Sequence, residues 1–189
     1  NYSMVVQTPE EFSVSNDRGF DIHGLRYTYK KRARRIEPDD CVLVYVSGIR
    51  KWTATCTFTS RYFEDRQPIW NLDGTEDQYP LRVHMSPAIV LDEADYIDAL
   101  QIGPRLEYVK RWIPERWPLA FVETLHLLPQ RDFRLIEGEM KRITSKHGRG
   151  QNKVSKDENG SGDDKKNQGG DVGTEEGQDR NASVLHPTR

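Results

Sequence analysis

The sequence predicts an α+β fold in which a mixed β-barrel of about five to six strands is surrounded by short helices. Three observations lead to this prediction. The chain has 189 residues and 35% hydrophobic content, which suffices for one domain with a core. Its apolar segments are short, as strands are. No regular alternation of strands with long helices, the mark of a doubly wound sheet, runs along it.

The first forty residues are expected to form one strand and two helical segments. Residues 1–7 are predicted to be a strand, residues 9–17 a short helical turn and residues 18–24 a loop. Residues 25–37 are predicted to be a helix, because apolar side chains recur at helical spacing at Leu25, Tyr29, Ala33 and Ile36. The Pro-Asp-Asp turn that follows ends this helix.

The middle of the chain is expected to supply the central strands. Residues 41–46 are a continuous apolar run, typical of a strand buried on both faces. A hairpin connection at residues 47–50 leads to residues 53–59, where apolar side chains alternate with threonines as in a half-buried strand. Residues 81–85 alternate in the same way and predict a further strand.

The last part of the folded region is expected to close the domain. Residues 92–101 are predicted to be irregular or briefly helical, and residues 106–112 a short helix that Pro114 ends. Residues 119–125 are a predicted strand. A final helix over residues 132–143 is predicted from the spacing of Phe133, Ile136, Met140 and Ile143.

The composition changes near residue 147. Residues 147–189 contain 8 of the 14 glycines and no aromatic residue, so they cannot bury enough apolar surface to offset their ordering entropy. We therefore predict a folded domain over residues 1–146 and a disordered Gly/Asp/Lys-rich tail over residues 147–189. Such a composition is typical of a tail or linker rather than of a binding segment.

Charge and cysteine content narrow the classes of function. The formal net charge is −2, so attraction to a nucleic acid must come from a local patch. Cys41 and Cys56 lie in predicted strands and outside any zinc-ligand pattern, which indicates reduced, mostly buried thiols in a cytoplasmic protein. No metal or cofactor is expected. The chain shows no signal peptide or membrane span, and it begins with Asn1 rather than Met, which leaves open whether the true N-terminus is present.

A dense basic cluster lies on the predicted helix 25–37. Six basic residues fall within ten positions, with no acidic residue between them, whereas a solvated helix face usually mixes charges. The cluster is therefore interpreted either as a solvated face or as a stripe that binds phosphates. Its members are Arg26, Lys30, Lys31, Arg32, Arg34 and Arg35, of which Arg26, Lys30 and Arg34 share one helix face.

Aromatic and polar side chains flank this cluster. Trp70 and Tyr79 lie in a loop region beside predicted strands, where they could stack on an unpaired base or plug one end of the barrel. Asp21 and His23 precede the predicted helix and could hydrogen-bond the edge of a base, although a loop histidine is more often simply solvated. Gly24 suits a position where a ligand or another backbone approaches closely.

No catalytic motif is present. The sequence lacks GxSxG, Walker and HExxH patterns. Its acidic pairs, Glu64-Asp65 and Asp92-Glu93, are adjacent in sequence, so on a strand their side chains would point to opposite faces. The sequence therefore favours a binding module over an enzyme.

Six landmarks occur in order over residues 1–143. They are residues 1–6, residues 19–25, Tyr62-Phe63-Glu64-Asp65 with Pro68-Ile69-Trp70, residues 79–83, residues 89–93 and residues 104–109. Together they resemble the EVE domain family. This resemblance implies a PUA-like barrel related to the YTH readers of methylated adenine in RNA. EVE domains are regarded as readers of modified bases in DNA or RNA, and some bacterial ones accompany restriction systems.

The resemblance also implies a pocket for a single, modified base, single-stranded or flipped out of a duplex. Trp70 matches a cage tryptophan of YTH domains. Arg26, which follows Gly24-Leu25, stands where those readers carry an aromatic, and Ser3 stands where EVE members often carry tryptophan. The base is expected to contact Trp70, Ser3, His23, Arg26, Tyr27 and Tyr79, and its flanking phosphates Lys30 and Arg34.

Two alternatives remain open from the sequence. Some PUA-like barrels of the ASCH type hydrolyse modified nucleosides with a lysine and a glutamate, and Lys51, Thr53 and Glu64 are available for such a role. Alternatively, the chain is an adaptor whose tail tethers it to a restriction-type effector protein.

Overall fold

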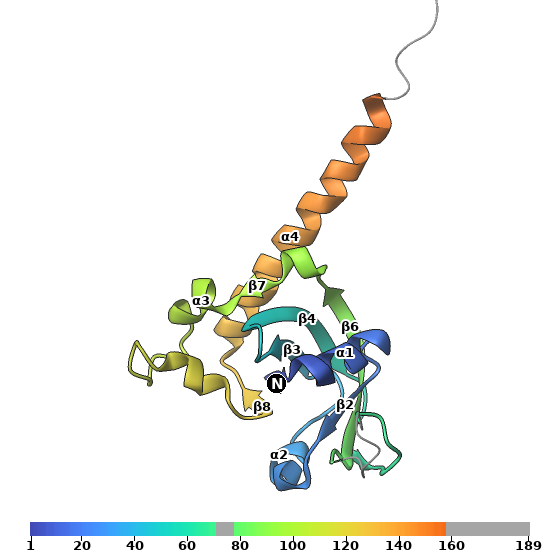
Figure 1. The fold of residues 1–189 in the computed structure, drawn as a ribbon, viewed down its shortest axis with the longest axis vertical. Coiled ribbons are helices and arrows are strands. Elements are labelled where there is room, and N and C mark those ends of the chain that lie inside the picture. The colour runs from blue at the N-terminus through green and yellow to red at the C-terminus, as the bar shows by residue number, and fades with distance from the viewer. Residues whose placement is uncertain (71–77, 158–189) are drawn as a thin grey trace, which may run out of the picture.

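The protein is built on one mixed, curled β-sheet. The computed structural model describes residues 1–70 and 78–157, with side chains up to residue 147. The main strand order is β2-β6-β4-β3-β1-β8, while β5 pairs with β6 and β7 with β4 (Figure 1). The strands are β1 (Tyr2–Gln7), β2 (Ile22–Leu25), β3 (Cys41–Val46), β4 (Lys51–Phe58), β5 (Phe63–Glu64), β6 (Leu81–Val90), β7 (Ile97–Asp98) and β8 (Leu125–Leu127).

Short helices surround this sheet, and one long helix ends the described chain. The α-helices are α1 (Pro9–Asp17), α2 (Lys30–Ala33), α3 (Ala99–Ile102) and α4 (Gln130–Asp157). The 3-10 helices are η1 (Tyr27–Tyr29), η2 (Glu93–Asp95), η3 (Gly103–Arg105) and η4 (Trp117–Phe121). The predicted α+β architecture, a curled mixed sheet with short helices, is confirmed. No helix in the described ranges is long and apolar enough to cross a membrane.

The first strand lies inside the sheet. β1 pairs in parallel with β3, Tyr2 opposite Cys41, and antiparallel with β8, Ser3 opposite Leu127. Both predicted strands, residues 1–7 and 41–46, are confirmed. Because β1 and β3 are paired on both sides, their backbone hydrogen bonds are made within the sheet, and their near-continuous apolar sequences are buried on both faces.

Each face of the sheet covers its own apolar cluster. On one face Met4, Leu43 and Trp52 pack with side chains of α4, including Phe133, Ile136 and Met140. On the other face Val5, Val42, Val44, Cys56 and Phe58 pack with Phe20, from the connection that follows α1, and with Leu25 of β2. Cys41 and Cys56 are free thiols, and burial raises the pKa of the Cys56 thiol to about 12.

The start of α1 is fixed by a reciprocal capping arrangement. The Thr8 hydroxyl accepts a hydrogen bond from the Glu11 backbone amide, and a Glu11 carboxylate oxygen accepts one from the Thr8 amide at 2.8 Å. Pro9 occupies the first turn, where its missing N–H leaves no bond unmade. This cap holds the Glu11 carboxylate at the end of β1.

The predicted long helix over residues 25–37 is wrong. Residues 22–25 instead form β2, which pairs with β6, His23 opposite Val83 and Leu25 opposite Leu81. The remainder forms only η1 and the four-residue α2. The helical spacing of Leu25, Ala33 and Ile36 reflects a shared apolar cluster rather than one continuous helix, because tertiary pairing overrode the local pattern.

Three further expectations need correction. Residues 106–112 form turns instead of a helix, and the predicted strand over residues 119–125 is η4 followed by β8. β4 is not half-buried as predicted: Thr53 and Thr55 are as buried as the apolar residues between them, since both faces of the sheet are covered. Residues 106–112 and η4 both lie where prolines and aromatic side chains pack irregularly against the first apolar cluster.

Helix α4 leaves the body of the protein (Figure 1). Its first turns bury Phe133, Ile136 and Met140 against the sheet, as the predicted helix over residues 132–143 required. The helix continues to Asp157, past the predicted domain boundary at residue 146. The rest of the predicted tail, residues 158–189, lies outside the described residues.

Candidate functional site

A small cleft lies beside Trp70, where the ends of β1 and β2 meet α1. Its lining includes Gln7, Glu11, His23, Gly24, Trp70, Tyr79 and Thr124, and we call it the Trp70 cleft. The Trp70 ring lies directly on Gly24: a Cβ added at Gly24 would stand 2.4 Å from the ring atom Cζ3. Gly24 is therefore the residue that admits the ring, as its place before the basic cluster suggested.

Trp70 is packed against protein in this conformation. The residue is 7% exposed, and the volume of the Trp70 cleft is about 10 Å³, room for roughly one water molecule. Its ring meets Tyr79 edge-on at 5.7 Å, and the Arg82 guanidinium lies 5.7 Å from its centroid. This packing fits the interpretation in which Trp70 and Tyr79 plug one end of the barrel.

A buried polar network lines the cleft. The Gln7 side-chain amide donates to the Ser15 hydroxyl at 2.8 Å and lies 3.5 Å from His23 Nδ1. Trp70 Nε1 lies 3.5 Å from the same Ser15 oxygen. Two atoms of this network, Gln7 Oε1 and His23 Nε2, are buried and have no hydrogen-bond partner among the residues that the structure describes. Buried polar atoms without a hydrogen-bond partner are rare in proteins, because each lowers the stability of the fold by about 1–3 kcal/mol.

His23 is neutral in this setting. It is 2% exposed, and burial lowers the pKa of its imidazole to about 4. With the Gln7 amide nitrogen facing Nδ1, that ring nitrogen accepts and Nε2 carries the proton. The cleft therefore presents one unpaired donor, His23 Nε2–H, and one unpaired acceptor, Gln7 Oε1.

Three side chains connect across the mouth of the cleft. The Tyr79 hydroxyl donates to the Glu11 carboxylate that also caps α1. The Arg26 guanidinium lies 5.7 Å from the centroid of the Tyr79 ring, and its hydrogen bond to Tyr79 raises the Arg26 pKa. Burial, then the bond to Glu11, raises the pKa of the Tyr79 phenol. Tyr79 is thus held over the cleft from both sides.

A larger groove opens from this mouth. It has a volume of about 610 Å³, within the range of roughly 300–1,000 Å³ typical of ligand pockets, and it shares Gln7, Glu11, Tyr79 and Thr124 with the Trp70 cleft. Its walls mix aromatic and apolar side chains with polar ones, and among the described residues its charged side chains are Glu11, Arg26 and Arg50. The lining includes Tyr29, Tyr45, Ser47, Pro118, Leu119, Phe121 and Val122, and we call it the groove.

The basic cluster is partly neutralised by acidic residues distant in sequence. Lys30 pairs with Glu64 at 2.7 Å, and Arg32 pairs with Glu123. The shared helix face of Arg26, Lys30 and Arg34 does not form, because Arg26 precedes η1 and Arg34 ends α2. Arg34 is exposed and makes no ion pair with any described residue.

Two of the predicted base contacts lie apart from the Trp70 cleft. Tyr27 is 55% exposed and stands against Lys30, outside the lining of the cleft and groove. Ser3 lies four residues before Gln7 on β1, about 13 Å along the strand. It lines a separate cavity of about 250 Å³ together with Arg32, Arg35, Tyr108 and His126.

The three residues of the alternative catalytic set lie outside the cavities described above. Thr53 is fully buried on β4, and its hydroxyl lies 3.5 Å from the Val44 carbonyl oxygen. Glu64 lies on β5 and pairs with Lys30. Lys51, Thr53 and Glu64 line none of the three cavities described above.

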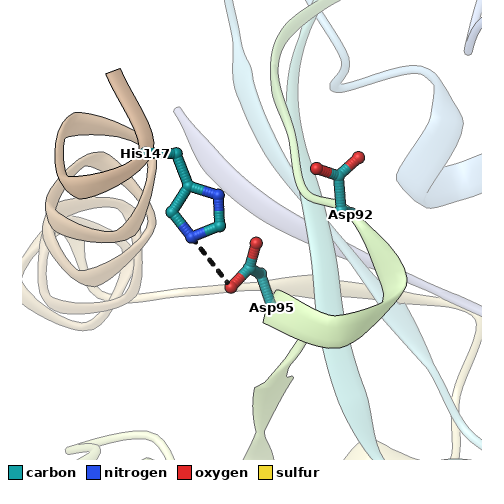
Figure 2. Close-up of side chains that lie close together, drawn as sticks. All are labelled: Asp92, Asp95 and His147. Atoms are coloured by element: carbon teal, nitrogen blue, oxygen red, sulfur yellow. Dashed lines mark ion pairs between the residues drawn. The ribbon is translucent and has the colours of Figure 1, made fainter. Parts of the chain in front are cut away.

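One group of side chains has metal-ligating chemistry. Asp92, Asp95 and His147 each bring one ligand atom to within 4.8 Å of the others, and Figure 2 shows His147 of α4 facing Asp95. His147 Nε2 lies 3.4 Å from an Asp95 oxygen, and Asp92 and His147 are exposed. The group connects α4 with η2 on the surface. None of its three residues lines the Trp70 cleft.

Sequence reasoning missed Gln7, Glu11 and Ser15. Gln7 is a polar residue at the end of an apolar strand, which is a signal only once that strand is known to be central. The Thr8-x-x-Glu11 spacing is a recognisable capping box and places Glu11 beside the strand end. Ser15 carries no signal of its own, since one serine on a short helix is usually solvated.

Comparisons with known proteins establish the kind of fold. The fold resembles a YTH domain-containing protein, mmi1, solved as a complex with RNA: TM-score 0.56, 7% identity, 78% of this chain and 86% of that one. It also resembles the YTH domain of Zygosaccharomyces rouxii MRB1 in complex with N6-methyladenosine RNA. The TM-score is 0.52 and the identity 13%, and the match covers 75% of this chain and 88% of that one. A third similar structure is a hypothetical protein from Leishmania major. The TM-score is 0.52 and the identity 11%, and the match covers 76% of this chain and 96% of that one.

At these identities the likeness establishes the fold alone, and the fold is YTH-like. No protein-family model matches the chain. No curated protein matches it either. Membership of the EVE family therefore stays a prediction from the six landmarks.

Proposed function

We propose that this chain is a non-enzymatic reader of nucleic acid that admits a single base into the Trp70 cleft. The observation that carries the proposal is the unpaired donor and acceptor, His23 Nε2–H and Gln7 Oε1, which are buried on two residues that line the Trp70 cleft. A base edge offers a neighbouring acceptor and donor that complement them. Binding would remove the cost that these two buried atoms carry in the closed cleft.

The aromatic side chains supply the rest of the binding energy. A base on the Trp70 ring, with Tyr79 and Arg26 at the mouth, gains about 1–3 kcal/mol from stacking. Because the closed cleft holds about 10 Å³, Tyr79 must leave its bonds to Glu11 and Arg26 before a base enters. The groove of about 610 Å³ outside Tyr79 provides the path. The observed affinity for the base equals the affinity of the open cleft multiplied by the fraction of molecules in which the cleft is open.

We propose RNA carrying a modified, methylated base as the ligand. Two of the YTH-like structures above are complexes with RNA, one of them with N6-methyladenosine, and this supports the choice. A methyl group suits the apolar side of the cleft, while the polar pair reads the rest of the base edge. Lys30 and Arg34 remain the proposed contacts for flanking phosphates, with Arg34 already unpaired among the described residues.

The six landmarks and the YTH-like fold together support an EVE-type domain. A hydrolase of the ASCH type is less well supported, because Lys51, Thr53 and Glu64 share no cavity described above. A binding module needs no such assembly. An adaptor role remains a separate prediction that concerns residues outside the described part of the chain.

A fluorescence titration tests the proposal. Short single-stranded RNA and DNA, unmodified or methylated on adenine or cytosine, are titrated at low and moderate salt. Wild type is expected to bind one modified oligonucleotide selectively. Trp70→Ala is expected to abolish this binding, but it also removes a buried ring and costs about 3–5 kcal/mol of stability.

Gln7→Met is the sharper variant. It keeps the approximate size of the side chain and deletes the unpaired acceptor, but it also removes the amide that faces Ser15 and His23, so it should cost about 1–3 kcal/mol of stability. Selectivity for the preferred base should fall roughly tenfold. Unchanged selectivity in both variants, with the fold intact by circular dichroism, would remove the Trp70 cleft as the base site.

A further inference from the structure

Among the residues that the structure describes, three other than glycine adopt the left-handed backbone conformation with positive φ. They are Phe20 (φ 56°), Asp39 (φ 70°) and Arg50 (φ 55°). This conformation costs roughly 1–2 kcal/mol for an ordinary residue, and glycine adopts it without strain. Phe20 recovers the cost by burying its ring in the second apolar cluster, and aspartate is one of the few residue types that tolerate it. Arg50 has neither explanation.

Arg50 is an exposed residue at the end of the β3–β4 hairpin. It directly precedes Lys51, which pairs with Val46 across the turn. Its carbonyl oxygen accepts a hydrogen bond from the Ala99 amide at 3.0 Å, so the neighbouring chain holds the backbone in place. A glycine at this position would satisfy the turn equally well.

The side chain of Arg50 lines the groove. It shares that lining with Arg26, and the two arginines are its only cations among the described residues. Arg26 is engaged with Tyr79, whereas Arg50 makes no ion pair with any residue that the structure describes. Its charge acts on Tyr45 in the same groove: burial raises the pKa of Tyr45 to about 12, and Arg50 opposes this shift. Arg50, a cation without an ion pair to any described residue, thus lines the same groove as Arg26, Tyr45 and Glu11.

We propose that Arg50 binds a backbone phosphate of the nucleic acid, and that the bound strand follows the groove from the Trp70 cleft to the β3–β4 hairpin. This inference rests on the proposed function and extends its footprint. A guanidinium offers two parallel N–H donors to phosphate oxygens, which glycine at this turn could not. Strain retained at a functional position is a known way of presenting a side chain.

The test compares Arg50→Gly with Arg50→Lys, and uses Lys110→Ala as the matched control. Lys110 is exposed and lies outside the groove lining. Affinity of each variant for the preferred short single-stranded RNA is measured over a series of salt concentrations. Arg50→Gly is expected to bind about tenfold more weakly at low salt, with the slope of log K against log salt smaller by about 0.7. Its melting temperature should equal or exceed that of wild type, because the strain is released.

Arg50→Lys should keep the wild-type slope, and Lys110→Ala should keep both affinity and slope. An Arg50→Gly variant with wild-type affinity and slope would overturn this inference while leaving the Trp70 cleft intact. Loss of affinity together with a lower melting temperature would also overturn it, because Arg50 would then have a structural role. A wild type that binds no oligonucleotide would overturn the proposed function and this inference with it.

Discussion

At the scale of single residues, the chain keeps polar atoms where an apolar core would be more stable. Gln7 and His23 lie between a central strand and α1, and each leaves one atom unpaired among the described residues. Leu or Met at both positions would remove that cost. Their presence is therefore the feature that separates this cleft from ordinary packing around Trp70.

The burial of His23 makes stability depend on pH. The unfolded chain binds a proton at His23 below about pH 6.5, whereas the folded protein does so only below about pH 4. Between these values the unfolded state holds more protons, so stability falls as the pH is lowered. The free energy of unfolding is expected to drop by about 3 kcal/mol from this residue between pH 7 and pH 4.

Urea unfolding at pH 7 and pH 4, with His23→Asn alongside, isolates this contribution. Other groups titrate in both proteins, so the relevant quantity is the difference between them. Between pH 7 and pH 4, the free energy of unfolding of His23→Asn should fall by about 3 kcal/mol less than that of wild type. Equal losses would mean that His23 becomes protonated in the folded state and is not the buried neutral donor.

At the scale of elements, the site is built where strand ends and a short helix meet. β1 supplies Gln7, β2 supplies His23 and Gly24, and the capping box of α1 supplies Glu11. β2 matters most, because its pairing with β6 carries His23 inward and leaves Gly24 against Trp70. A helix at these residues would have scattered the same side chains.

Two glycine substitutions should have opposite effects. Gly24→Ala places a Cβ 2.4 Å from the Trp70 ring, and it should destabilise the protein by about 1–3 kcal/mol. Gly138→Ala, in α4, meets nothing within 4 Å and should stabilise it by about 0.5–1 kcal/mol. Chemical unfolding of both variants measures the difference. A neutral Gly24→Ala would contradict the contact with Trp70.

The strands were more predictable than the helices. Runs such as residues 41–46 are apolar because both faces of the sheet are covered, and this is visible in the sequence. The predicted helix over residues 25–37 failed because the partner of β2 is β6, more than fifty residues away. Of the site, Trp70, Tyr79, His23 and Arg26 could be predicted, whereas Gln7 and Arg50 depend on contacts and a backbone angle that appear only in three dimensions.

At the scale of the whole molecule, the proposed binding of nucleic acid requires local positive charge. A net charge of −2 gives no overall attraction for nucleic acid, and Glu64 and Glu123 neutralise part of the basic cluster. Cations without ion pairs to described residues include Arg34 at the end of α2 and Arg50 in the groove. The expected affinity is therefore modest and strongly salt-dependent.

The predicted domain, residues 1–146, can be tested by truncation. The buried side chains of α4 named above end at Met140, and the His147–Asp95 ion pair is exposed and contributes little. A chain that ends at residue 146 should therefore unfold with a free energy within about 1 kcal/mol of the full chain. Met140→Ala should instead cost about 2–5 kcal/mol. Thermal and urea unfolding of the full chain, the truncated chain and Met140→Ala measure these differences. If truncation lowered the free energy of unfolding by several kcal/mol, the domain boundary would lie further along α4.

The place of β1 between β3 and β8 has a consequence for synthesis. Ser3 pairs with Leu127, so β1 can pair with β8 only after the ribosome has made the chain between them. At about 5–20 residues per second, β8 follows β1 by roughly 6–25 s. Until then β1 presents an open edge, and pairing over such sequence separations is slow. The nascent chain should therefore depend on chaperones in proportion to its translation time, and slowing translation between these strands should lower the yield of folded protein.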